Sequence, residues 1–131
     1  MPWAIVTSGT RPLVSGWLDV MKLAHPRNLV VAEDVSQGKP DPQCYVLGRN
    51  KLNLTPTSRM LVLEDAPSGV KAGKAAGFEV VALATTHDLS RLREAGADWI
   101  VQDMESVRFQ GWDAGRKEAT IEIVNALRRP E

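Results

Sequence analysis

Short apolar runs alternate along the chain with longer segments in which apolar residues recur at helical spacing. The short runs are rich in β-branched or bulky residues, which predicts strands at 4–6, 29–32, 60–63, 80–84 and 99–101. Between Thr10 and Ala24 the spacing predicts a helix that buries one face, made of Val14, Trp17, Leu18 and Met21. Similar spacing predicts helices at about 42–52, 67–76, 88–95 and 118–128, with C-terminal caps at Gly77 and Gly96. Segment 102–117 shows no such period, so we expect an irregular surface loop there.

This alternation predicts an α/β fold. Strands that alternate with helices form right-handed βαβ units, so we expect a doubly wound, mostly parallel sheet with helices on both faces. The 131 residues supply one ordinary core, so we expect a single domain over 1–131. In such sheets ligands bind beyond the carboxyl ends of the strands.

Composition excludes several classes of protein. Sixteen basic residues balance sixteen acidic ones, which argues against binding nucleic acid or anionic membrane through a general positive field. A lone cysteine, Cys44, can form neither an internal disulfide nor a cysteine-based zinc site. The apolar runs are far shorter than the ~20 residues of a membrane span, and no signal peptide is visible. We therefore expect a soluble, cytoplasmic protein.

Polar clusters follow the first two predicted strands. The first, TSGTR at 7–11, combines hydroxyls, a glycine and a base at a helix start, which is typical either of an anion cradle or of an ordinary helix cap. The second, QGKPDP at 37–42, presents Lys39 from a turn stiffened by prolines. A point charge held in this way suits a phosphoryl group, although a lone loop lysine is more often simply solvated.

The third cluster places two carboxylates, Glu64 and Asp65, where the strand at 60–63 ends. Such a pair suits a hard cation such as Mg²⁺, and the alternative is a helix cap beside a solvated acid. All three clusters lie at the carboxyl ends of strands in one predicted sheet. We therefore expect them to converge on one crevice.

The sequence motifs of the three clusters resemble those of a known family. VTSGT, GKPDP and VLEDAPSGVKAGKAAG look like motifs two, three and four of the haloacid dehalogenase-like (HAD) phosphohydrolases, and the resemblance extends to about residue 108. The fuller phrases are similar to the fungal glycerol-3-phosphatases and 2-deoxyglucose-6-phosphate phosphatases of that family. The resemblance implies a Rossmann-like core and a Mg²⁺-dependent phosphatase acting on a small sugar or polyol phosphate.

The resemblance also implies roles for individual residues. Ser8 would donate to the transferring phosphoryl group, with Gly9, Thr10 and Arg11 close to the phosphate. Lys39 would neutralise charge as the bond to the nucleophile forms. Asp65 would bind Mg²⁺, and Glu64 would bind the ion directly or through water.

The family's first motif has no counterpart in this sequence. That motif is a D-x-D strand that carries the aspartate nucleophile, and none of the eight aspartates here is followed two residues later by another. In the family's sheet this strand lies between the strands that bear motifs two and four, and a helical cap follows it. We therefore expect a partial core that is inactive alone, with the strands at 4–6 and 60–63 either separated by a gap or paired with each other. An N-terminal fragment or a second copy is the expected partner at the exposed edge.

Other functions fit the same residues less well. A phosphate-binding remnant would use Ser8 and Lys39 without turnover. A receiver-like signalling domain also combines an acid pair, a hydroxyl and a lysine, but the order of the clusters differs and a phosphoacceptor aspartate on a separate strand is missing. The phosphatase is the leading hypothesis.

Overall fold

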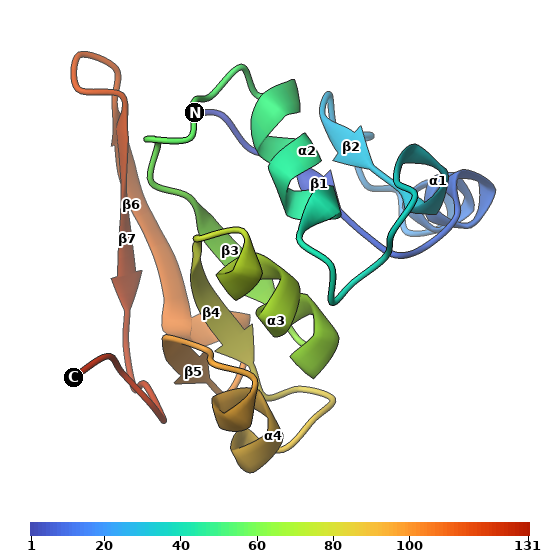
Figure 1. The fold of residues 1–131 in the computed structure, drawn as a ribbon. Coiled ribbons are helices and arrows are strands. Elements are labelled where there is room, and N and C mark those ends of the chain that lie inside the picture. Colours follow the sequence, from blue (N-terminus) through green and yellow to red (C-terminus); the bar gives the residue numbers. More distant parts are fainter.

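The computed structural model describes the whole chain, residues 1–131 (Figure 1). Its first half contains β1 (Ile5–Val6), α1 (Arg11–Val20), β2 (Leu29–Val30), a 3-10 turn (Ala32–Asp34) and α2 (Gln43–Lys51). The second half contains β3 (Leu61–Glu64), α3 (Pro67–Ala75), β4 (Glu79–Leu83), α4 (Leu89–Glu94) and β5 (Trp99–Val101). It ends with a second 3-10 turn (Met104–Ser106), β6 (Val107–Asp113) and β7 (Glu118–Ile123). None of the helices is long and apolar enough to cross a lipid bilayer.

The predicted strands form two separate parallel sheets. β1 pairs with β2, and β3, β4 and β5 pair in that order. No ladder joins β1 to β3, so the first of the two expected arrangements, a gap, is the one observed. The parallel α/β fold class is confirmed.

Helices cover the sheets through small residues that allow close approach. On one side of β1, Gly48 of α2 lies close to Val6, and α1 lies on the side of Ile5. Gly73 of α3 packs on Val62 and Val80 of the second sheet. The core between these layers is fully buried at its centre, including Val30, Val70, Val80, Leu92 and Ile100.

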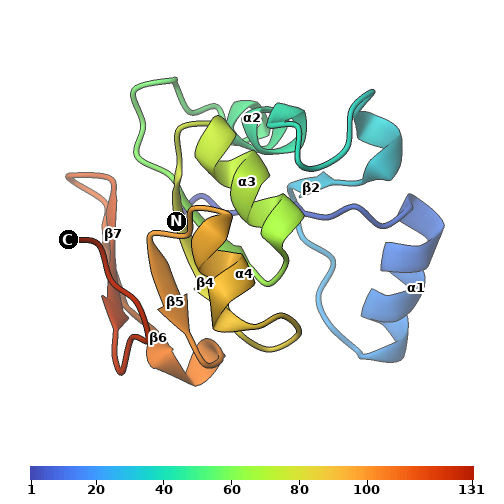
Figure 2. The same ribbon diagram turned by 60° about the horizontal axis from the view of Figure 1, so that its bottom comes forward.

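One face of β3 is uncovered. Leu61 and Leu63 alternate with the buried Val62, and these two residues are 39% and 44% exposed. The helices α2, α3 and α4 lie together on the opposite side, as Figure 2 shows. The gap and this uncovered face border the same region of the second sheet.

The predicted buried face of α1 is only partly correct. Leu18 is buried, but Trp17 and Met21 are 58% and 60% exposed. The helix lies at one end of the molecule (Figure 1, Figure 2). Its apolar residues line an open hollow beside Ile5. The predicted helix is therefore present, but most of its apolar face has no partner.

The predictions for the C-terminal segment are wrong. The helix expected at 118–128 is strand β7 followed by irregular chain, and the loop expected at 102–117 contains a 3-10 turn and strand β6. The two strands form an antiparallel hairpin, with Val107 opposite Ile123. The period of two in TIEI, with its β-branched residues, favours a strand once a partner is present. Asp113 closes the turn by accepting the amides of Gly115 and Arg116 at 2.9 and 3.0 Å.

Candidate active site

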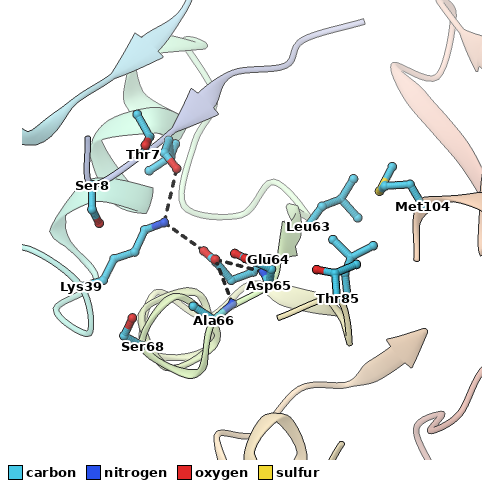
Figure 3. A pocket seen from close by; sticks show the side chains of 12 residues that line it. Thr7, Ser8, Lys39, Leu63, Glu64, Asp65, Ala66, Ser68, Thr85 and Met104 are labelled. Carbon is cyan, nitrogen blue, oxygen red and sulfur yellow. Dashed lines mark hydrogen bonds and ion pairs between the residues drawn. The ribbon is translucent and has the colours of Figure 1, made fainter. Parts of the chain in front are cut away.

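A cavity of about 690 Å³ lies where the gap between the two sheets meets the carboxyl ends of β1 and β3 (Figure 3). Most of its polar lining comes from the three predicted clusters. The polar side chains at its wall are Thr7, Ser8, Lys39, Glu64, Asp65, Ser68 and Thr85. The structure thus brings Ser8, Lys39, Glu64 and Asp65 to one cavity.

Lys39 connects the two sheets. Its Nζ donates to the Val6 carbonyl of β1 at 3.3 Å and to Glu64 Oε2 at the end of β3 at 2.9 Å. It also lies 5.0 Å from the centre of the Tyr45 ring, within the range of a cation–π contact. An ammonium group has three N–H donors, so one donor is left for a ligand in the cavity that Lys39 lines.

The turn that carries Lys39 is ordered by polar contacts. The Gln43 side chain accepts from Ser36 Oγ at 3.0 Å and from the Gln37 amide at 2.9 Å. Asp41 Oδ1 accepts the Gln43 amide at 2.9 Å. These bonds tie the loop to the start of α2, so the lysine projects from a fixed base.

Glu64 uses its whole hydrogen-bonding capacity inside the protein. Oε1 accepts the amides of Asp65 and Ala66 at 3.1 and 3.3 Å, while Oε2 accepts Lys39 Nζ at 2.9 Å and the Tyr45 hydroxyl at 2.5 Å. A carboxylate has about four lone-pair sites, and all of them are filled here. Burial, followed by the hydrogen bond to Glu64, raises the pKa of Tyr45, so the phenol stays a donor.

The residues at this wall do not by themselves make a magnesium site. The oxygen chemistry of two carboxylates suits Mg²⁺, but a cation could reach Glu64 only by displacing one of its four donors. Asp65 retains free acceptor capacity, since its contact is the Thr86 hydroxyl on Oδ2 at 3.0 Å. The chain contains no cluster of three or more acidic, histidine or cysteine side chains suited to a metal. Of the two expected ligands, Asp65 alone is available in this arrangement.

The first cluster divides between the cavity and the surface. Ser8 lines the cavity, whereas Gly9, Thr10 and Arg11 lie outside its lining. The Arg11 amide donates to both oxygens of Glu33, at 2.9 and 3.1 Å, and the Arg11 guanidinium pairs with Asp34 at 3.2 Å. A carboxylate from the 3-10 turn therefore already stands at the start of α1, where an anion was expected.

Two residues at this site were missed by sequence reasoning. Tyr45 is 7% exposed and donates to Glu64, and Gly69 lies beneath the Glu64 side chain. A buried tyrosine needs a partner for its hydroxyl, which is the signal that could have pointed to Tyr45.

Comparison with known proteins matches this chain to one family. The family model for haloacid dehalogenase-like hydrolases matches residues 1–83. Glycerol-1-phosphate phosphohydrolase 1 of Saccharomyces cerevisiae is 43% identical over 91% of this chain and 50% of its own length. The 2-deoxyglucose-6-phosphate phosphatase 2 of the same yeast is 41% identical over 80% of this chain and 46% of its own.

Solved structures show the same relationship. The crystal structure of a hydrolase from Pseudomonas syringae superposes with a TM-score of 0.70 at 31% identity, covering 77% of this chain and 47% of that one. The chain spans about half the length of the curated relatives it matches. With motifs two, three and four assembled around one cavity and a family model covering more than half of its residues, the chain belongs to the haloacid dehalogenase-like hydrolases.

Proposed function

We propose that this chain forms the phosphate-handling part of a Mg²⁺-dependent phosphatase for small sugar or polyol phosphates. The observation that carries the proposal is Lys39, whose ammonium is held by Glu64 at a cavity that Ser8 also lines. Its similarity to yeast proteins named as glycerol-1-phosphate and 2-deoxyglucose-6-phosphate phosphatases supports this substrate class.

The residues present suit phosphoryl transfer, which depends mainly on positioning and on neutralising charge. The remaining Lys39 donor would bind a phosphoryl oxygen, and Ser8 Oγ would donate to a second one. Asp65 would contribute one carboxylate to a magnesium site completed by groups beyond those at this wall.

The nucleophile is the component that this chain does not provide. No D-x-D pair occurs in the sequence, and β1 and β3 present facing edges without a ladder between them. An extended segment that carries the aspartate could pair with both edges and reach the cavity. We therefore propose that the chain alone turns over poorly and gains activity when such a segment is supplied.

The test is hydrolysis of glycerol phosphate and 2-deoxyglucose 6-phosphate in the presence of Mg²⁺. We expect the turnover number of the chain alone to stay well below about 1 s⁻¹, which is the lower end of the range for working enzymes. Adding a peptide that carries a D-x-D strand of the family should raise turnover, and Lys39→Ala or Asp65→Ala should then abolish most of it. Ser8→Ala should cost about tenfold or more, as expected for a hydrogen bond to a charged group. Rapid turnover by the chain alone, or activity that survives both Lys39→Ala and Asp65→Ala, would overturn the assignment.

A second function is favoured by the fact that Lys39 is already positioned without the missing strand. The chain would then bind a phosphorylated metabolite without hydrolysing it. Calorimetric titration with inorganic phosphate separates the two functions. Binding that disappears in Lys39→Met, with no hydrolysis under any of the conditions above, would favour the binding protein.

A further inference from the structure

The carboxylate of Glu64 is held in a tightly fitted position above helix α3. A methyl group placed on Gly69 would overlap Cδ and Oε2 of Glu64. The backbone at Gly69 lies outside the left-handed region, so its conformation does not itself require glycine. The absent side chain therefore provides space for Glu64, not backbone freedom.

Tyr45 fixes the same carboxylate from helix α2. Its hydroxyl and Lys39 Nζ both donate to Oε2, at 2.5 and 2.9 Å, and the Glu64 side chain is 8% exposed. The backbone amides of Asp65 and Ala66 hold the other oxygen. The carboxylate cannot rotate without breaking these bonds, and its side chain is too little exposed for water to replace all of them.

We propose that Gly69 and Tyr45 are positioning residues, which fix Glu64 as the counter-charge of Lys39 and so hold the lysine ammonium at the cavity. In this arrangement Glu64 serves the lysine and not a metal ion. The consequence for phosphate rests on the proposed function, whereas the placement of Lys39 can be measured without any ligand.

The test is competitive acylation of the native chain with a small amount of acetic anhydride, with each lysine quantified by peptide mass spectrometry. Lys39 is 11% exposed and paired, so it should react slowly compared with the exposed Lys71. Gly69→Ala displaces Glu64 and should raise the rate at Lys39 relative to Lys71 by about tenfold, since charge-assisted hydrogen bonds are among the strongest. Tyr45→Phe keeps the ring over the lysine and removes one hydroxyl, so a rise of about threefold is expected.

Gly16→Ala is the matched control, because a methyl group there meets no atom within 4 Å and the residue also lies in a helix. It should leave the Lys39 rate unchanged. Circular dichroism and the rates of the other lysines show whether a variant is folded, and Tyr45→Phe keeps the test decisive if Gly69→Ala does not fold. An unchanged Lys39 rate in folded variants, or an equal rise at every lysine, would overturn the proposal.

A separate arm tests the proposed function. Protection of Lys39 by inorganic phosphate in the unaltered chain would show that the ammonium binds phosphate. Absence of protection, combined with the expected rates in the variants, would leave the positioning role intact and refute the phosphate role.

Discussion

Replacing Lys39 with methionine should destabilise the folded chain well beyond the usual effect of losing a lysine. The side chains of Lys39 and Glu64 are 11% and 8% exposed, so solvent screens their interaction little. Removing one partner of a buried ion pair costs about 3–5 kcal/mol, because the other charge is left uncompensated. Glu64 would keep three of its four donors, and we therefore expect the free energy of unfolding to fall by about 2–4 kcal/mol. Methionine has a similar length, so the loss of packing is small.

The assay is urea unfolding followed by circular dichroism, with Lys71→Met as the control on the exposed side of α3. The double variant Lys39→Met with Glu64→Gln should lose less stability than the sum of the two single changes. Glu64→Gln makes the side chain neutral, so no unpaired charge remains when Lys39 is absent. We expect a coupling of at least about 1 kcal/mol between the two positions. If Lys39→Met and Lys71→Met lower the free energy of unfolding equally, the ion pair contributes nothing and the reasoning fails.

The parallel core and the position of the site could be predicted from local patterns. Short β-branched runs between amphipathic segments indicate parallel strands, and the ends of such strands share one edge of the sheet. This reasoning placed Ser8, Lys39, Glu64 and Asp65 together, although 57 positions separate the first from the last. The strand order implied by the family left two arrangements open for β1 and β3, a gap or direct pairing, and only the structure decides for the gap.

The remaining features depend on contacts that no short window contains. The TIEI segment could form a helix or a strand, and its pairing with β6 decided the outcome. Glu64 and Asp65 are neighbours in sequence and suggest a shared metal, but Lys39 and Tyr45 approach Glu64 from other elements and fill its lone pairs. The predicted burial of the α1 face is only partly correct for a different reason. The pattern requires a packing partner, and no other element of the fold covers most of that face.

Two further changes test the packing and the electrostatics away from the cavity. Gly73→Ala should cost about 1–3 kcal/mol in urea unfolding, because its methyl group would lie 2.8 Å from Val80 Cγ2. Gly16→Ala, at an exposed position inside α1 with open space around it, should instead stabilise the fold by about 0.5–1 kcal/mol. Asp34→Asn should flatten the acid side of the stability profile. The hydrogen bond from the Val31 amide is the largest cause that lowers the pKa of Asp34 below its usual 3.8. A lowered pKa means that the unfolded chain binds the proton more readily, so the stabilisation is present above 3.8 and disappears as the pH falls through the folded value. Unfolding measured at roughly pH 6, 4 and 3 should therefore show the advantage over Asp34→Asn shrinking with acid, and a constant difference would refute this role for Asp34.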